Sequence, residues 1–155
     1  MKAKEIMTSP VVTVTEDTPV PEVAALLRGR RISAVPVLDA AGAVVGLVSE
    51  YDLLARAGET AAEVMTRAVI SVTEDTDVEE VRHLLIERRI RRVPVLAAGA
   101  LVGIVSRSDV VALLTSEWVC GVCGQSARGE HPPARCPTCH ADADRFTAQE
   151  APPGS

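Results

Sequence analysis

The sequence predicts an α/β (α+β) fold in which two βαββα repeats pack sheet to sheet, followed by a small metal-stabilised knuckle. The repeat is directly visible, because the residues around Met7 return around Met65, 58 positions later (65 minus 7). Hydrophobic residues make up 47% of the 155 residues but aromatic residues only 2%, so the core must be aliphatic, as in strands packed under helices. All four cysteines follow Trp118 in two Cys-x-x-Cys pairs, which suit one metal ion better than disulfides in an intracellular chain.

Each repeat contains three runs rich in branched aliphatic residues, which predict short strands. In the first repeat these runs are residues 11–14, 35–38 and 44–48. Thr18 is expected to cap a helix with Pro19 at its first position, where a missing N–H is harmless, and Val23 and Leu27 share its apolar face. A second helix is expected to begin near Asp52. The predicted domains are residues 1–57 and 58–115 for the repeats, 116–148 for the knuckle and 149–155 for a flexible tail.

Charge and motif content exclude several classes of function. The formal net charge is -5, whereas a nucleic-acid-binding protein usually carries a basic surplus on its binding face, so nucleic acid is not the expected partner. No apolar run approaches the roughly 20 residues that span a bilayer, and no signal peptide follows Lys2 and Lys4. We therefore expect a soluble, cytoplasmic protein that does not bind membranes. The sequence contains no catalytic triad, P-loop or dinucleotide-binding glycine motif, so an enzyme is not expected.

The order of elements, the Met-Thr openings, the Val-Pro-Val strands and the segment from Gly46 to Asp52 resemble the CBS (cystathionine beta-synthase) motif. The resemblance covers roughly residues 1–115. It implies a regulatory protein that senses an adenosyl nucleotide, of the AMP, ATP or S-adenosylmethionine class, in clefts where the two motifs meet. Pairs of such modules commonly form a disc-like dimer, so the resemblance also implies a homodimer. A sensor without an output domain is expected to act on a separate effector protein.

Two pairs of residues could hold the ribose of such a ligand: Ser49 with Asp52, and Ser106 with Asp109. Each pair follows a predicted strand and opens a helix, where exposed N–H groups favour an anion and a carboxylate can accept from both ribose hydroxyls. The same Ser-x-x-Asp spacing is also that of a plain helix cap. Both interpretations stay open, and the CBS resemblance favours ligand contact.

Arg91 and Arg92 are candidates for binding phosphate, because a guanidinium group can pair with two phosphate oxygens. The alternative is a basic, solvated strand edge. The CBS resemblance implies two clefts. The first would combine Thr8, Val12, Ile32, Ser33, Ala34, Arg91, Arg92, Ile104, Ser106 and Asp109. The mirror cleft would combine Thr66, Ile70, Ile90, Arg91, Ser49 and Asp52. Ser33 and Ala34 replace the two arginines in the first repeat, so the clefts are inequivalent, and the first has the fuller set of polar groups.

The predicted metal ligands are Cys120, Cys123, Cys136 and Cys139. Two Cys-x-x-Cys turns can close a tetrahedron of thiolates around zinc or iron, and binding would supply the folding free energy of this short segment. The segment from Trp118 to Phe146 resembles the rubredoxin-like tail of rubrerythrins. Two other functions therefore stand beside the sensor: an iron-bearing, rubredoxin-like electron-transfer protein docked or gated by the CBS pair, and a zinc-ribbon regulator associated with nucleic acid.

Overall fold

The structure is a computed structural model that describes residues 1–149. It divides into two compact units, Met1–Ser106 and a second unit that begins at Arg107, and each is described by itself. Apart from Gln149, the predicted flexible tail lies outside the described residues. Among the described residues, no helix has both the length and the apolar character required to span a bilayer.

The first unit contains both repeats. The first repeat forms α1 (Ala3–Ile6), β1 (Val14–Thr15), α2 (Val20–Arg30), β2 (Ala34–Leu38), β3 (Val44–Ser49) and α3 (Glu50–Ala55). The second repeat forms α4 (Ala61–Val64), β4 (Val72–Thr73), α5 (Val78–Glu87), β5 (Arg92–Ala97) and β6 (Ala100–Ser106). Its last helix, α6 (Arg107–Ala112), opens the second unit, although the sequence assigned residues 58–115 to one repeat.

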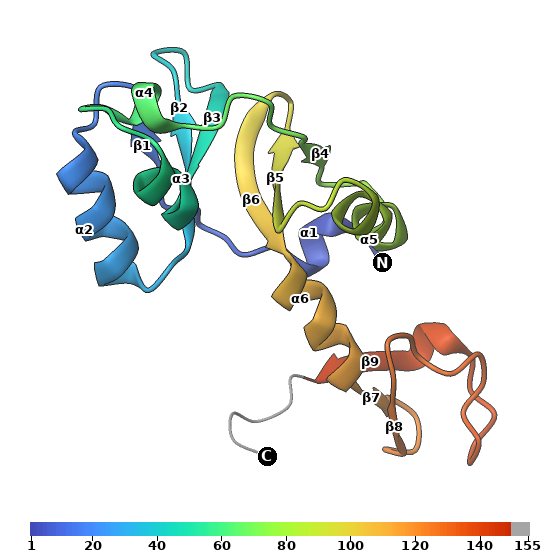
Figure 1. Ribbon diagram of the computed structural model, residues 1–155. Coiled ribbons are helices and arrows are strands. Elements are labelled where there is room, and N and C mark those ends of the chain that lie inside the picture. The colour runs from blue at the N-terminus through green and yellow to red at the C-terminus, as the bar shows by residue number, and fades with distance from the viewer. Residues whose placement is uncertain (150–155) are drawn as a thin grey trace. The chain divides into compact units, whose positions relative to one another are not determined.

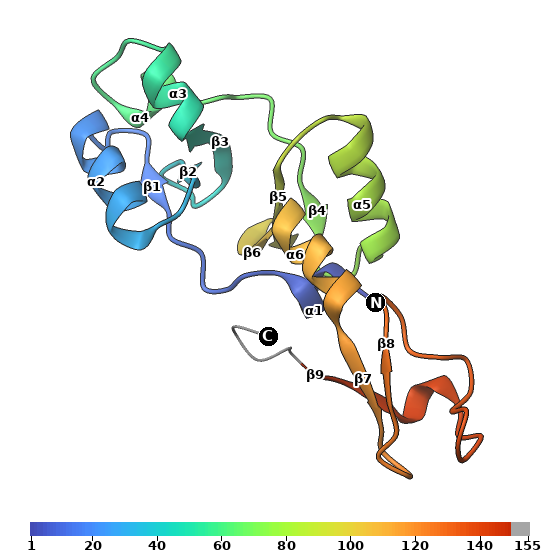
Figure 2. The ribbon, with the colours of Figure 1, turned by 60° about the horizontal axis from the view of Figure 1, so that its bottom comes forward.

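The two sheets of the first unit have the same topology. Each has three strands, in the orders β1-β2-β3 and β4-β5-β6, with the first pair parallel and the second pair antiparallel. Figures 1 and 2 show both sheets lying between α2 on one side and α5 on the other. Val35 and Val37 of β2 are fully buried, as are Val93 and Val95 of β5. The predicted α/β fold of two repeats is thus confirmed.

The opening helix of each repeat belongs to the body of the other repeat. The backbone N–H of Ala3 donates to Thr76 O at 2.8 Å, and that of Ala61 donates to Thr18 O at 2.8 Å. The residue after each Met then forms an antiparallel bridge: Thr8 with Ile104 of β6, and Thr66 with Leu47 of β3. In Figure 1, α1 accordingly lies beside β6, and α4 lies beside the first sheet. This exchange carries Thr66 into the first repeat, where it joins the candidate site.

Two glycines inside strands make room for the methionines of the exchanged segments. A side chain at Gly46 would place its Cβ 2.6 Å from Met65 Sδ, and one at Gly103 would place its Cβ 2.3 Å from Met7 Sδ. Distances below 3.0 Å require the neighbour to move, so the exchanged segment can approach only where the strand has no side chain.

The predicted helix cap at Thr18 is wrong by one residue. Pro19 is the N-cap of α2, and Thr18 Oγ1 instead accepts from the backbone N–H of Thr15 at 3.0 Å. In the second repeat the cap is Asp77, whose carboxylate accepts from the N–H of Glu79 at 2.9 Å. Thr18 belongs to the turn after β1, so α2 begins one residue later than expected.

The second unit is small and contains a three-stranded sheet. Its elements after α6 are the 3-10 helix η1 (Leu113–Thr115), β7 (Glu117–Cys120), β8 (Ser126–Arg128), the 3-10 helix η2 (Ala143–Arg145) and β9 (Phe146–Gln149). The strand order is β8-β7-β9, and both pairs are antiparallel. Trp118 and Phe146 are buried, and the indole N–H donates to Gly129 O at 2.9 Å.

Candidate functional site

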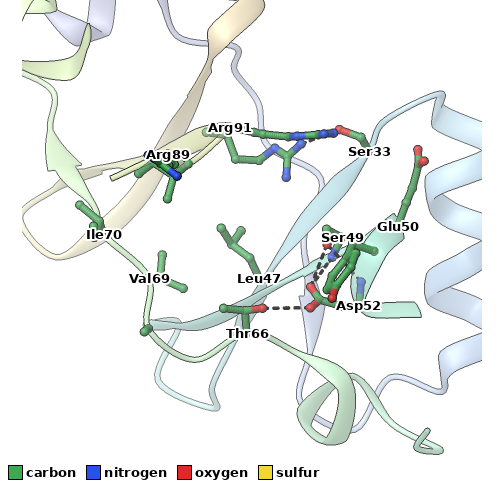
Figure 3. A pocket seen from close by; sticks show the side chains of 14 residues that line it. Ser33, Leu47, Ser49, Glu50, Asp52, Thr66, Val69, Ile70, Arg89 and Arg91 are labelled. Atoms are coloured by element: carbon green, nitrogen blue, oxygen red, sulfur yellow. Dashed lines mark hydrogen bonds between the residues drawn. The ribbon is translucent and has the colours of Figure 1, made fainter. Parts of the chain in front are cut away.

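A cavity of about 430 Å³ lies between the two repeats of the first unit. It is bounded by the end of β3 and the start of α3 from the first repeat, and by the segments before β4 and β5 from the second. Figure 3 shows Asp52 and Thr66 on one side of it, with Arg89 and Arg91 on the opposite side. A volume of this size lies within the range of small-molecule sites.

Asp52 is the buried charged residue of this cavity, with 3% of its surface exposed. Its Oδ2 accepts from Ser49 N at 2.8 Å and from Ser49 Oγ at 3.0 Å, while Ser49 Oγ caps α3 by accepting from Asp52 N at 3.3 Å. Its Oδ1 accepts from Thr66 Oγ1 at 2.9 Å (Figure 3). The pair is therefore a helix cap, and its carboxylate also lines the cavity, so the two interpretations of Ser-x-x-Asp are compatible.

The opposite side of the cavity is basic. Arg92 donates from Nη2 to Ser33 Oγ at 2.7 Å, which joins the start of β5 to the start of β2. Burial, and after it the neighbouring Arg91, hold the pKa of the Arg92 guanidinium below its usual value, against the opposing effects of Glu50 and Asp52. An anion bound here would relieve this crowding of positive charge.

The structure brings eight of the predicted ligand residues to this cavity: Ser33, Ser49, Asp52, Thr66, Ile70, Ile90, Arg91 and Arg92. The other seven do not line it: Thr8, Val12, Ile32, Ala34, Ile104, Ser106 and Asp109. Thr8 and Ile104 are nevertheless paired in a β-bridge, while Asp109 lies in α6 of the second unit.

Ser33 and Arg92 lie in a different cleft from the one expected. The sequence grouped them with Asp109, whereas both line the cavity of Asp52. The reason is the β2–β3 hairpin, whose antiparallel pairing sets Ala34 opposite Ser49 and brings Ser33 O to the N–H of Glu50 at 3.0 Å. The mirror cleft is therefore better supplied with polar groups than the sequence suggested.

Six lining residues were not among the predicted ones: Leu47, Glu50, Tyr51, Ala68, Val69 and Arg89. Most have a recognisable signal in hindsight. Glu50 and Tyr51 lie inside the Ser49–Asp52 motif, and Ala68 and Val69 lie between two predicted residues. Arg89 directly precedes the predicted residues Ile90, Arg91 and Arg92.

The arrangement suits a ligand with three chemically distinct parts. The Asp52 carboxylate can accept hydrogen bonds from hydroxyl groups, and the arginines can pair with an anion. Leu47, Val69 and Ile70 offer apolar surface to a flat ring.

The four cysteines of the second unit form a separate cluster, with their sulfur atoms all within 4.8 Å of one another. Cys120 Sγ and Cys139 Sγ are 3.6 Å apart, as are Cys123 Sγ and Cys136 Sγ. A disulfide would need about 2.05 Å, and all four cysteines are free. A metal–sulfur bond of about 2.3 Å in a tetrahedron gives edges of about 3.8 Å, so the cluster fits one metal ion.

Backbone N–H groups near these sulfurs favour the thiolate form, which binds a cation. The backbone N–H of Cys139 contributes most to lowering the pKa of the Cys136 thiol to about 6. The N–H of Ala141 acts in the same direction on Cys139, but burial and the three neighbouring sulfurs outweigh it and raise the pKa of that thiol to about 12. Four thiolates this close repel one another, and a metal ion would stabilise all of them.

Comparison with known proteins assigns a family to each part of the chain. The CBS domain model matches residues 3–59 and 61–116, and the model of the rubrerythrin rubredoxin-like domain matches residues 118–147. The chain is 33% identical over 117 residues to the uncharacterized protein YlbB of Bacillus subtilis (strain 168), a match that covers 70% of this chain and 79% of YlbB. Two enzymes among the other curated relatives match over only 23% of their own length.

Solved structures of CBS pairs resemble the first unit. CBSX2, crystallised in complex with AMP, is 32% identical, with a TM-score of 0.67 over 71% of this chain and 93% of that one. The CBS domain pair of MJ0100, in complex with 5′-methylthioadenosine and S-adenosyl-L-methionine, is 32% identical, with a TM-score of 0.69 over 73% and 94% of the two chains. With two CBS motifs matched over most of its length and a rubredoxin-like domain after them, the chain belongs to the CBS-domain family.

Proposed function

We propose that this chain is a regulatory sensor that binds an adenosyl nucleotide of the AMP, ATP or S-adenosylmethionine class in the cavity between its CBS motifs. The observation that supports this most is the division of the cavity into the Asp52 carboxylate on one side and Arg89 and Arg91 on the other, with Arg92 also among its lining residues. A ribose would contact the carboxylate and a phosphate the guanidinium groups. CBS pairs similar to this one have been crystallised with AMP and with S-adenosyl-L-methionine.

Thermal unfolding of the full, metal-loaded chain with AMP, ADP, ATP and S-adenosylmethionine tests the proposal. A ligand at a hundred times its dissociation constant stabilises the folded state by about 2.7 kcal/mol, which raises the midpoint by several degrees. The shift should be lost in Asp52→Asn and kept in Cys123→Ser. If none of the four ligands raises the unfolding midpoint at millimolar concentration, the protein is not a sensor of this class.

A second pair of variants tests the basic side of the cavity. Arg91→Ala should weaken the binding of AMP, because Arg91 lines the cavity. Arg88→Ala is the matched control, since Arg88 is an exposed arginine at the end of α5. Equal weakening by both variants would indicate a general effect of charge and remove the specific role of Arg91.

In the second unit we propose that Cys120, Cys123, Cys136 and Cys139 hold one zinc or iron ion. Zinc would cross-link the unit, whereas iron could also carry one electron. The exposure of Cys123 at the surface favours the electron-transfer alternative, because a partner could approach that ligand closely. The visible absorption spectrum and metal content of protein purified without added metal separate the two, since zinc thiolates are colourless.

We also propose a homodimer formed through the CBS pair, acting on a separate effector protein. Tyr51 and Leu54 support it, because they leave 73% and 89% of their surface exposed on α3. Light scattering of the parent protein and of Leu54→Glu measures the state directly. A monomeric parent protein would rule the dimer out.

A further inference from the structure

We infer that Arg56 is the positioning residue that sets Asp52 for a ribose, and that it makes this cleft selective for ribonucleotides over deoxyribonucleotides. The inference rests on the proposed function, because it assigns a ligand group to the same cavity. Arg56 does not line the cavity itself and therefore acts through Asp52.

The geometry shows how one side chain can do this. Arg56 is the C-cap of α3, four residues after Asp52, and its Nε lies 3.8 Å from Asp52 Oδ1, while its Nη1 donates to Met65 O at 2.9 Å. Met65 directly precedes Thr66, whose hydroxyl donates to the same Oδ1 at 2.9 Å. The guanidinium group of Arg56 thus contacts both the Asp52 carboxylate and the Met65-Thr66 segment, which comes from the second repeat.

The hydrogen bonds of Asp52 leave a defined position for a ligand. Oδ2 already accepts two hydrogen bonds from Ser49, whereas Oδ1 accepts one from Thr66 and faces Arg56 across an ion-pair distance. A carboxylate oxygen has two lone pairs, so Oδ1 retains capacity for a hydroxyl of the ligand. The orientation of Oδ1 depends on the two groups that hold it, Thr66 and Arg56.

The second repeat does not reproduce this arrangement. Asp109 corresponds to Asp52, and the residue four positions later is Leu113 in place of Arg56. A leucine forms no ion pair and donates no hydrogen bond. Arg56 is therefore a feature of one cleft, and the property it confers belongs to that cleft alone.

The test is a comparison of AMP with 2′-deoxyAMP by calorimetry on the full, metal-loaded chain. A hydroxyl bonded to a charged carboxylate should make the parent protein prefer AMP on the order of tenfold to a hundredfold. Arg56→Leu, which installs the residue of the second repeat, should reduce this preference to a few-fold. Arg56→Lys should retain most of it, while Arg56→Gln, which can still donate to Met65 O but carries no charge, should not.

Arg67→Leu is the matched control, because Arg67 is also exposed and also donates to a backbone carbonyl, Ala62 O, at 3.3 Å. It should leave the preference unchanged. If Arg56→Leu weakens both ligands equally, or neither, Arg56 serves packing and the inference is wrong although the sensor proposal stands. If the parent protein binds neither ligand, the proposed function fails and the role of Arg56 fails with it.

Discussion

Replacing Gly46 by alanine should destabilise the first unit, because the exchanged segment leaves no room for a methyl group. The new Cβ would lie 2.6 Å from Met65 Sδ and 2.9 Å from Thr66 O. Met65 is 2% exposed, and Thr66 O accepts from Leu47 N at 3.0 Å, so neither atom can move without loss of packing or of the bridge. Overpacking of this kind costs about 1–3 kcal/mol.

For a unit of this size, such a cost lowers the thermal midpoint by at least about 4 °C. Circular dichroism melts of the metal-loaded protein measure it. Gly29→Ala is the matched control, since its Cβ would meet nothing within 4 Å in α2, and alanine should stabilise that helix by about 0.5–1 kcal/mol. A Gly46→Ala protein that melts at or above the parent temperature would refute the argument. In a Met65→Ala background, the same Gly46→Ala change should cost less than in the parent protein, because the sulfur contact is then gone.

Three further outcomes are expected. Chelation of the metal should expose Trp118, the only tryptophan in the chain and 7% exposed, and shift its fluorescence to longer wavelength. His140 follows the second Cys-x-x-Cys turn with φ 63°, at the position where Gly124 follows the first. His140→Gly should slow metal loss to a chelator, because relief of a left-handed backbone conformation is worth up to about 1 kcal/mol. Ser49→Ala should lower the urea-unfolding free energy by about 1 kcal/mol, since it removes the α3 cap.

Local patterns in the sequence were enough to predict the strands and the repeat. Val35 and Val37 lie in a short run of aliphatic residues, and their copies Val93 and Val95 do the same, so both sheets could be predicted. The exchange of opening helices does not follow from periodicity, although the CBS resemblance already grouped Thr66 with Ser49 and Asp52, and Thr8 with Ile104. The exchange depends on the three-dimensional fit of Met65 against Gly46, which no periodicity encodes.

The candidate site was predictable where chemistry and position coincide. Ser49 and Asp52 form a recognisable motif, and the cysteine spacing specifies a four-sulfur cluster. The CBS resemblance grouped Ser33 with Asp109, whereas the β2–β3 hairpin brings Ser33 O to Glu50 N and Ser33 lines the cavity of Asp52. Arg56 gave no signal, because an arginine four residues after an aspartate on a helix usually marks a solvated ion pair.

The two repeats have kept their backbone contacts and lost the symmetry of their charges. The Leu47–Thr66 bridge is matched by Thr8–Ile104, and the bond of Thr15 N to Thr18 Oγ1 is matched by that of Thr73 N to Thr76 Oγ1. Three arginines at or beside the cleft have no such match, although Asp52 is matched by Asp109: Arg91 corresponds to Ser33, Arg92 to Ala34 and Arg56 to Leu113. Contacts that hold the fold are needed twice, because each repeat completes the other. Groups that bind an anion are needed only where a ligand sits. Because these arginines have no counterparts in the first repeat or, for Arg56, in the second, we expect each chain to bind one nucleotide, in the cavity of Asp52.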